Sequence, residues 1–411
     1  MTTTSSSRLT GASRPTAQRA RIGAVLKVPR RRRRELHPRS TEYLILVSVV
    51  GALCVAGLVM VLSASAVSSL RAYRMPWYYF ERQGLYLGAG VVAFLVAHRV
   101  GMDRWRRLAR PLFVVATCGL MAVLVAGRSA GGAARWLGSG SVQFQPSELA
   151  KLALVLFAAD VLARREGKRD WMYRCTPVLV AILGFVGLIM KQPDMGTAVV
   201  ICCIGAAILF TAGMPVRAMV GLGATGAVAG VVFATTASYR AARLTSFWDP
   251  FAHASSTGYQ SVQGLIALGA GHWTGTGIGQ SLASWGYLPN QYTDFIFAVI
   301  GQEAGFAGSM VMLGLFALLC VVGMRVSWSA ETTFDALVAA GATAWLAAQA
   351  VINVGAVAGV LPVTGVPLPF VSYGGTSLVI VLFATGLLAN IARRAPVAQS
   401  ASGRAAARVL A

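Results

Sequence analysis

Ten apolar segments, each about long enough to cross a bilayer, alternate with polar stretches along this chain of 411 residues. A helix needs about 20 apolar residues to cross a hydrocarbon core about 30 Å thick. Only 12% of the residues are charged, whereas about 25% are charged in a soluble globular protein. The sequence therefore predicts an all-α polytopic membrane protein with about ten transmembrane helices. The expected spans are residues 43–65, 79–98, 111–127, 148–164, 174–190, 195–213, 216–236, 294–323, 334–357 and 376–392.

The net charge of +22 is concentrated in alternate connections and in the tails. It is not spread over a soluble domain with aromatic stacking platforms, so no nucleic-acid partner is expected. Because basic loops stay on the cytoplasmic side, we expect both termini in the cytoplasm. Residues 1–42 are expected to form a disordered basic cytoplasmic tail, and residues 393–411 a second tail. The first tail is either a topogenic signal or a docking segment for anionic lipid or a division protein.

Cysteine and histidine indicate neither a disulfide framework nor a metal site. The six cysteines all fall in apolar segments, where a thiol is usually a small packing residue. The four histidines are scattered along the chain and form no cluster of metal-ligand spacing. We therefore assign no metal ligand.

Two connections on the expected outer side are long or irregular enough to carry chemistry. Residues 237–293, between the seventh and eighth spans, form a large extracytoplasmic loop that is too long for a simple connector. Residues 364–377 read TGVPLPFVSYGGTS, and their prolines and glycines forbid a regular helix. Irregular backbone at membrane depth must be shielded by protein or line a cavity. We therefore expect a re-entrant or cavity-lining loop before the last span.

Asp294 is the carboxylate best placed for external chemistry, because it stands where the long loop meets the eighth span. One interpretation is an N-terminal helix cap, since Asp and the preceding Thr293 accept hydrogen bonds from free amides. The other is a general base at the bilayer surface. One residue can do both, so position alone does not exclude either role.

Three further carboxylates have simpler interpretations. Glu303 lies deep in the eighth span, where an ionisable group usually faces a partner or a polar cavity, and we favour a structural role. Asp194 lies in the turn KQPDMGT, which fits an Asp turn, an ion pair with Lys191, or help in positioning a phosphate. Glu148 suits the positive end of the fourth span, and Lys151 can reach it on the same helix face.

Six long blocks of sequence carry a more specific signal. They are RWLGSGSVQFQPSELAK (135–151), KQPDMGT (191–197), YRAARLTSFWDPF (239–251), GYQSVQGLIALGAG (258–271), LPNQYTDFIFAVIGQEAGF (288–306) and INVGAVAGVLPVTGVPLPFVSYGGTS (352–377). Together they closely resemble the SEDS family, named for shape, elongation, division and sporulation. The stretch TSFWDP is more similar to the division branch than to the elongation branch. The resemblance implies a ten-span membrane domain over residues 43–392.

The resemblance also implies a peptidoglycan glycosyltransferase that polymerises lipid II into glycan strands during septal wall synthesis. It would work on the outer face of the bacterial cytoplasmic membrane, beside a class B penicillin-binding transpeptidase, other division proteins and membrane lipids. The family's catalytic aspartate corresponds to Asp294, within TDFIFA. The family's usual double acid is replaced here by Gln302 and Glu303, and its usual histidine by Tyr292. No proton role is therefore expected at Tyr292.

In the implied reaction, a sugar hydroxyl attacks an anomeric carbon with inversion, and polyprenyl pyrophosphate leaves. Asp294 would accept the hydroxyl proton, and the leaving group needs positive charge. The candidate cations are Arg243, Arg240, Lys191, Arg135 and Lys151. A divalent cation, Mg²⁺ or Mn²⁺, is a further candidate without assigned ligands. The expected supporting residues are Glu303, Asp194, Glu148, Ser372, Tyr373, Gly374 and Gly375.

Three alternatives remain open at this point. An elongation-branch polymerase would use the same chemistry. A lipid flippase predicts a polar path across the bilayer, whereas few charges besides Glu303 fall within the spans. A noncatalytic division scaffold predicts that replacing Asp294 leaves assembly and growth intact.

Overall fold

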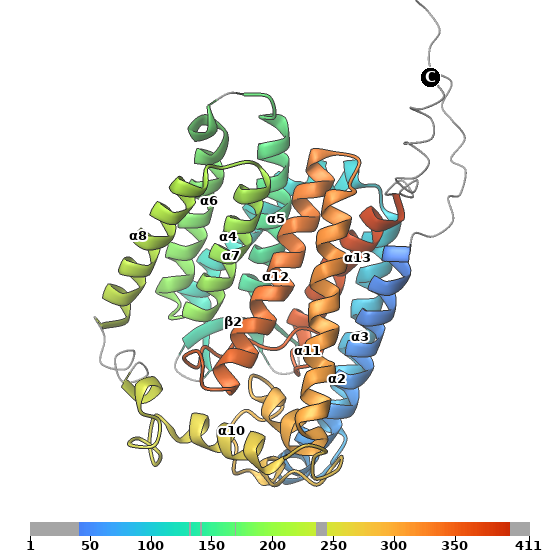
Figure 1. Cartoon of the computed structure of the whole chain (residues 1–411), viewed down its shortest axis with the longest axis vertical. Helices are drawn as coiled ribbons and strands as arrows, with labels where there is room; N and C mark the ends of the chain where they lie inside the picture. The colour runs from blue at the N-terminus through green and yellow to red at the C-terminus, as the bar shows by residue number, and fades with distance from the viewer. Residues whose placement is uncertain (1–40, 131–132, 140–141, 169, 236–244, 395–411) are drawn as a thin grey trace, which may run out of the picture. The chain divides into compact units, whose positions relative to one another are not determined.

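The computed structural model describes residues 41–130, 133–139, 142–168, 170–235 and 245–394 (Figure 1). These residues belong to one compact unit. The two expected tails lie almost wholly outside the described residues, and residues 237–244 of the large loop lie wholly outside them.

Each expected span corresponds to one long helix within these ranges. The helices are α2 (Thr41–Tyr73), α3 (Tyr78–Arg99), α4 (Met102–Ala126), α5 (Pro146–Arg164), α6 (Trp171–Lys191), α7 (Met195–Thr211), α8 (Val216–Thr235), α11 (Ile296–Trp328), α12 (Thr333–Val357) and α13 (Gly375–Arg394). α2 ends later than expected and α4 begins earlier, because each extension contains alanine, leucine and arginine, which favour helix. By length and composition, α2, α4, α6, α11, α12 and α13 can each cross a membrane. The polytopic helical class is confirmed, and the number of crossings stays a prediction.

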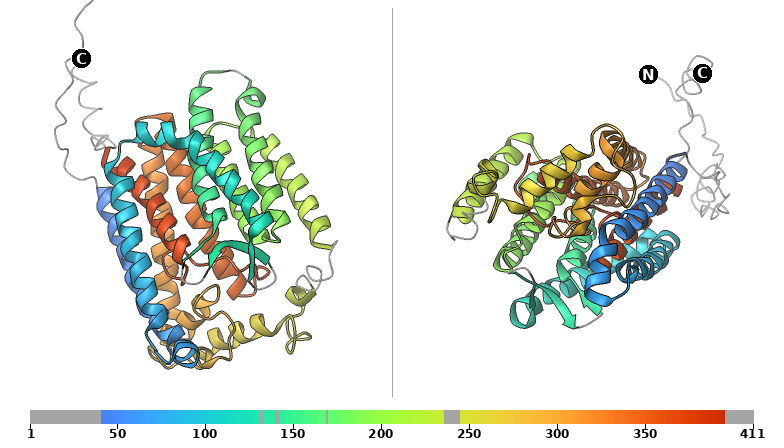
Figure 2. Two further views of the ribbon diagram at one scale, coloured as in Figure 1. Left: turned by 180° about the vertical axis from the view of Figure 1, so that it is seen from behind. Right: turned by 90° about the horizontal axis from the view of Figure 1, so that it is seen from below.

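The most buried helices are α5, α12 and α13. α5 buries residues around most of its circumference, and α12 packs against α5, α7 and α11. α13 packs mainly against α3. In Figures 1 and 2, α6 and α8 lie on one side of these central helices, and α2 and α3 on the other. Polar side chains on α5 and α12 are therefore shielded from lipid by other helices.

One end of the bundle carries structure that the sequence did not indicate. Residues before α5 form an antiparallel sheet of β1 (Arg128–Ala130), β2 (Ala133–Ser139) and β3 (Val142–Phe144), in that order. The large loop adds a helix, α10 (Tyr259–Ala270), and a 3₁₀ turn, η1 (Leu282–Trp285). Figure 1 places β2 and α10 at the same end. This is the end expected to face outward.

α11 is broken at Gly305, where the backbone is left-handed with φ 68°. Residues 272–277 of the large loop satisfy the backbone on both sides of the break. The amides of Phe306 and Ala307 donate to carbonyls at 272 and 273, at 2.9 and 3.1 Å. The carbonyls of residues 302 and 303 accept from amides at 276 and 277, at 3.0 and 3.1 Å. The expected continuous span is thus two segments, residues 296–304 and 306–328, and the loop supplies the missing helical partners.

Candidate active site

A cavity of about 390 Å³ lies at the end of the bundle that carries β2 and α10. Its lining comes from β2, from the first turns of α5 and α7, from the turn before α11 and from α12. Residues 363–367, 373, 374 and 377 also line it, and so does Gln260 of α10. The expected cavity-lining loop before the last span is therefore confirmed.

Asp294 lies at this cavity, on the turn that leads into α11. The helix begins at Ile296, and its N-cap is Phe295 without a side-chain cap, so the helix-cap interpretation of Asp294 is wrong. The turn is closed by the amides of Thr293 and Phe295, which donate to the carbonyl of Asn290 at 3.1 and 3.3 Å. The Thr293 hydroxyl donates to Asp294 Oδ1 at 3.1 Å. The turn therefore holds the carboxylate at the cavity, clear of the helix end.

Asn353 on α12 ties this turn to the irregular loop. Its side-chain amide donates to the carbonyl of Asp294 at 2.7 Å and to the carbonyl of Val366 at 2.8 Å. A backbone bond of 2.9 Å from the amide of Tyr373 to the carbonyl of Tyr292 makes a second link. The backbone of the candidate base and the cavity-lining loop are thus held as one unit.

Tyr292, which replaces the family's usual histidine, is packed in an aromatic cluster. Its ring stacks on Tyr79 with 4.6 Å between centroids, and Tyr373 meets both rings edge-on. Burial raises the pKa of Tyr373, on the loop outside the spanning helices, to about 12. The Tyr373 hydroxyl therefore keeps its proton at neutral pH, while Tyr292 supports the turn by packing.

Among the described candidate cations, only Arg135 lines the cavity. A Cβ added at Gly365 would lie 3.7 Å from Asp294 Oδ2 and 3.9 Å from Arg135 Nη1, so both groups border the space that a side chain at this position would enter. The φ of Gly365 is 72°, a conformation that favours glycine. A carboxylate and a guanidinium therefore both line the cavity beside a residue without a side chain.

Asp194 holds Arg135 in this position. Arg135 Nε lies 3.6 Å from Asp194 Oδ2, and Nη2 donates to the carbonyl of Pro193 at 3.0 Å. Asp194 also caps α7 by accepting from the amide and the hydroxyl of Thr197. The ion pair of Asp194 is thus made with Arg135. Lys191 is exposed at the end of α6 and lies outside the cavity lining.

The expected pair of Glu148 and Lys151 is confirmed and forms a buried network. Lys151 Nζ donates to Glu148 Oε1 at 2.8 Å and lies 5.1 Å from the centroid of the Trp345 ring. The Ser377 hydroxyl donates to Glu148 Oε2 at 3.1 Å. Glu148 lines the cavity but Lys151, which is only 1% exposed, does not. Lys151 therefore neutralises Glu148 from behind the cavity wall.

Gln349, four residues before Asn353 on the same face of α12, also lines the cavity. It is 1% exposed, and neither polar atom of its side chain has a hydrogen-bond partner among the described residues. Leaving a buried amide without partners costs about 1–3 kcal/mol, so this side chain is suited to a polar ligand group. Neither residue was predicted from the sequence. The signal was a polar side chain inside an apolar span.

Glu303 lies outside the cavity lining. It is buried, and it accepts a hydrogen bond from the Ser63 hydroxyl on α2. The neighbouring Gln302 accepts from the Ser281 hydroxyl and from the amide of Ala283. Both side chains thus join α11 to neighbouring segments at a distance from Asp294.

The other residues predicted to support the site differ in where they lie relative to the cavity. Ser372 closes a backbone turn, and Gly374 lines the cavity beside Tyr373. Gly375 begins α13 against the ring of Tyr86, which lies 2.5 Å from where a Cβ would stand. The other two expected cations, Arg240 and Arg243, lie outside the described residues.

The carboxylates at the cavity do not fit a dedicated divalent-cation site. No group of three or more Asp, Glu, His or Cys side chains in the described part of the chain is close enough to hold a metal ion. Glu148 is paired with Lys151, and Asp194 with Arg135. No chemical step is therefore assigned to a metal.

Four helices begin at the cavity. Glu148, Thr197 and Ser377 line it from the first turns of α5, α7 and α13, and Asp294 precedes α11. A helix N-terminus carries about half a positive charge and exposes amide donors. The cavity therefore favours an anion through these helix ends as well as through Arg135.

Replacing Asn353 by alanine is expected to slow the chemistry of this site about tenfold and to lower stability by about 2 kcal/mol, because two buried hydrogen bonds are lost. Asn390→Ala is the matched control. Asn390 makes the same two types of backbone bond, to Ala97 and Val100 at 2.8 and 2.7 Å, far from the cavity. Thermal unfolding and turnover, measured on both variants, separate the effects. Equal turnover in the two variants would contradict a positioning role for Asn353.

Fold and site together define a class: a polytopic membrane protein with a polar cavity at one end, which is lined by a carboxylate, a guanidinium and an irregular loop. Comparison with known proteins makes the class specific. The chain belongs to the FtsW/RodA/SpoVE family of cell cycle proteins, whose profile matches residues 44–396. The resemblance stated from the six sequence blocks is therefore confirmed.

Individual relatives agree with this family. A probable peptidoglycan glycosyltransferase FtsW of Legionella pneumophila is 38% identical over 357 residues, covering 84% of this chain and 89% of the relative. Stage V sporulation protein E of Bacillus subtilis is 37% identical over 358 residues, which cover 86% of this chain and 98% of the relative.

Solved structures show the same fold. A chain from a peptidoglycan synthase complex that coordinates polymerization and crosslinking is 32% identical, with a TM-score of 0.71, covering 85% of this chain and 96% of that one. The rod shape determining protein RodA of Thermus thermophilus is 31% identical, with a TM-score of 0.63 and coverages of 85% and 96%.

Proposed function

We propose that this chain is a peptidoglycan glycosyltransferase that polymerises lipid II into glycan strands. The observation that carries the proposal is that Asp294 and Arg135 both lie beside Gly365, at a cavity large enough for sugar groups. The names of its FtsW relatives support the same activity.

Asp294 is the proposed general base. As the 4-hydroxyl oxygen of the acceptor N-acetylglucosamine bonds to C1 of the donor muramyl sugar, its proton passes to the Asp294 carboxylate. The bond from C1 to the phosphate oxygen breaks, and its electron pair leaves with polyprenyl pyrophosphate. A single displacement of this kind inverts C1.

The charge that develops on the pyrophosphate is met by Arg135 and by the helix N-termini at the cavity. Gln349 is suited to hold a polar group of a bound sugar. Arg240 and Arg243, on the undescribed part of the large loop, stay proposed as further cations.

We place the cavity on the outer face of the bacterial cytoplasmic membrane, with both termini in the cytoplasm. The basic connection between α5 and α6 lies at the opposite end of the bundle from β2, which supports this orientation (Figure 1). A class B penicillin-binding transpeptidase is the proposed partner, in keeping with the similar chain from a complex that couples polymerization to crosslinking. The FtsW relatives and the TSFWDP stretch favour a role in septal wall synthesis over one in cell elongation.

The test is polymerisation of lipid II by the purified protein, alone and with its cognate transpeptidase, read as glycan length on a gel. Polymer is the expected product. Lipid II that crosses vesicle membranes without polymerising, under every partner and divalent-cation condition, would favour a flippase. If the protein neither polymerises nor transports lipid II but still binds the transpeptidase, the scaffold function would be favoured.

A further inference from the structure

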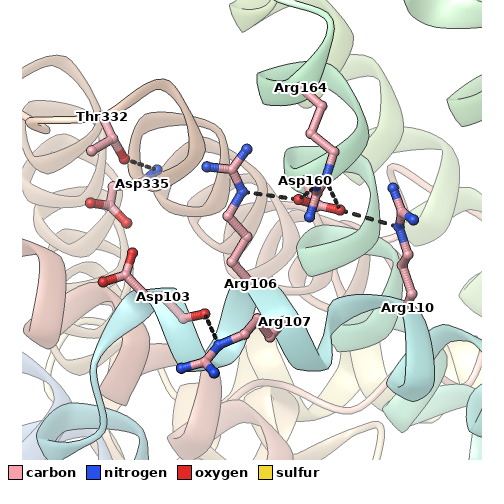
Figure 3. Close-up of polar contacts among 8 residues, drawn as sticks. All are labelled: Asp103, Arg106, Arg107, Arg110, Asp160, Arg164, Thr332 and Asp335. Atoms are coloured by element: carbon pink, nitrogen blue, oxygen red, sulfur yellow. Dashed lines mark hydrogen bonds and ion pairs between the residues drawn. The ribbon is translucent and has the colours of Figure 1, made fainter.

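A cluster of arginines at the end of the bundle opposite the cavity surrounds one buried carboxylate (Figure 3). Asp160 on α5 is fully buried. Arg106 Nε lies 2.9 Å from its Oδ1, Arg164 Nε lies 2.7 Å from Oδ1, and Arg110 Nε lies 3.4 Å from Oδ2. Three guanidiniums therefore share one carboxylate, which leaves an excess of two positive charges.

The three guanidiniums use only some of their N–H donors in contacts with the described residues. Each approaches Asp160 through Nε, and their terminal nitrogens make no hydrogen bond or ion pair with any described residue. The side chains of Arg164 and Arg110 are 50% and 61% exposed, whereas Arg106 is 35% exposed and lies over the ring of Phe334. Arg110 and Arg164 therefore present unused N–H donors at the surface.

The surface next to these donors is apolar. From Arg110, one face of α4 continues through three exposed side chains and one exposed thiol, at intervals of four, eight, eleven and fifteen residues: Val114, Cys118, Met121 and Val125. Fifteen residues of helix extend about 22 Å, longer than the roughly 15 Å of one bilayer leaflet's hydrocarbon. A ligand with an anionic head and a long apolar chain matches both parts of this surface.

We propose that Arg110 and Arg164, held by Asp160, form a binding site for the phosphate of an anionic phospholipid, whose acyl chain lies along the exposed face of α4. Planar guanidiniums suit phosphate oxygens, and the Nε contacts to Asp160 fix their orientation. A free phosphate would use the same donors but would gain nothing from the apolar stripe. The carboxylates of Asp103 and Asp335 lie on the far side of Arg106 in Figure 3, away from Arg110.

The test is lipid binding to the purified full chain, measured by native mass spectrometry with phosphatidylglycerol and, separately, with phosphatidylcholine of the same acyl chains. Wild type is expected to bind phosphatidylglycerol more tightly. Arg110→Gln should weaken that binding about fivefold, since one arginine near a charged membrane contributes about 1 kcal/mol, and should leave phosphatidylcholine unchanged. Arg106 and Arg164 still pair with Asp160 in this variant, so the fold is kept.

Arg107→Gln is the matched control, because Arg107 is exposed on the same helix and contacts only the carbonyl of Asp103, at 3.4 Å. Equal affinity for the two lipids, or equal loss in the Arg110 and Arg107 variants, would overturn the site. In a final experiment, soluble glycerol 3-phosphate is added as a competitor for the bound lipid. No displacement of lipid at millimolar concentration supports a lipid site, whereas displacement by this headgroup alone would assign the arginines to a soluble phosphate.

Discussion

Asp294→Asn is expected to lower the rate of glycan polymerisation from lipid II by about 10³-fold, within the range of about 10²–10⁴ that a general base contributes. The amide keeps the size of the side chain but cannot accept the proton of the attacking hydroxyl. The backbone contact to Asn353 is unchanged, so the variant should fold and bind its partner as wild type does. Polymer formed per unit time, with and without the cognate transpeptidase, measures the effect.

Asp249→Asn is the matched control for charge. Asp249 is exposed on the large loop, where its carboxylate accepts from the amide of Ala252 at 3.0 Å, and it does not line the cavity. The Asp249→Asn variant should polymerise lipid II at the wild-type rate. An Asp294→Asn protein that polymerises as fast as this control would remove Asp294 from the role of base.

Arg135→Gln is expected to cost about 10²-fold in the same assay, the usual loss when one group that stabilises developing charge is removed. The variant loses the guanidinium that lies with Asp294 beside Gly365. Asp194 keeps its bonds to Thr197, so α7 retains its cap. Arg135→Lys should recover only part of the rate, because an ammonium cannot span both Asp194 and the carbonyl at 193 as the planar fork does.

Lys191→Gln is the matched control for Arg135→Gln. It distinguishes the local contact of Arg135 at the cavity from a general effect of net charge. It removes the same charge from a nearby exposed position outside the cavity lining. Its rate should stay at the wild-type level. An equal loss in the two variants would mean that net charge, and not the contact at Gly365, governs the reaction.

The helices were predictable because length and apolarity alone require them in a membrane protein. Apolarity does not mark where a helix ends in polar residues, which is why α4 begins at Met102 rather than at 111. The sheet before α5 was missed, since β1 and β3 are only three residues long and β2 has no alternating apolar pattern. The break at Gly305 was missed because its partners lie some thirty residues earlier in the chain.

The site was only partly predictable for a related reason. Asp294 stands out because few carboxylates lie on the side expected to face outward, and Arg135 lies within a recognisable block. Which cation lies near Asp294 depends on how β2 and the loop at Gly365 pack, and the sequence does not show this packing. The pairing of Lys151 with Glu148 was predicted from their spacing, but its burial behind the cavity wall was not. Gln349 and Asn353 were missed because a ten-span pattern treats α12 as uniformly apolar.

The glycine break in α11 separates the hydrogen bonding of the short first segment from that of the rest of the helix. At its C-terminal end, residues 296–304 are hydrogen-bonded to residues 272–277 of the large loop, where an unbroken helix would bond to its own next turn. Asp294 stands two residues before the other end of the same segment, where the amide of Asn353 holds its carbonyl. The position of the carboxylate therefore depends on the large loop as well as on the helical bundle.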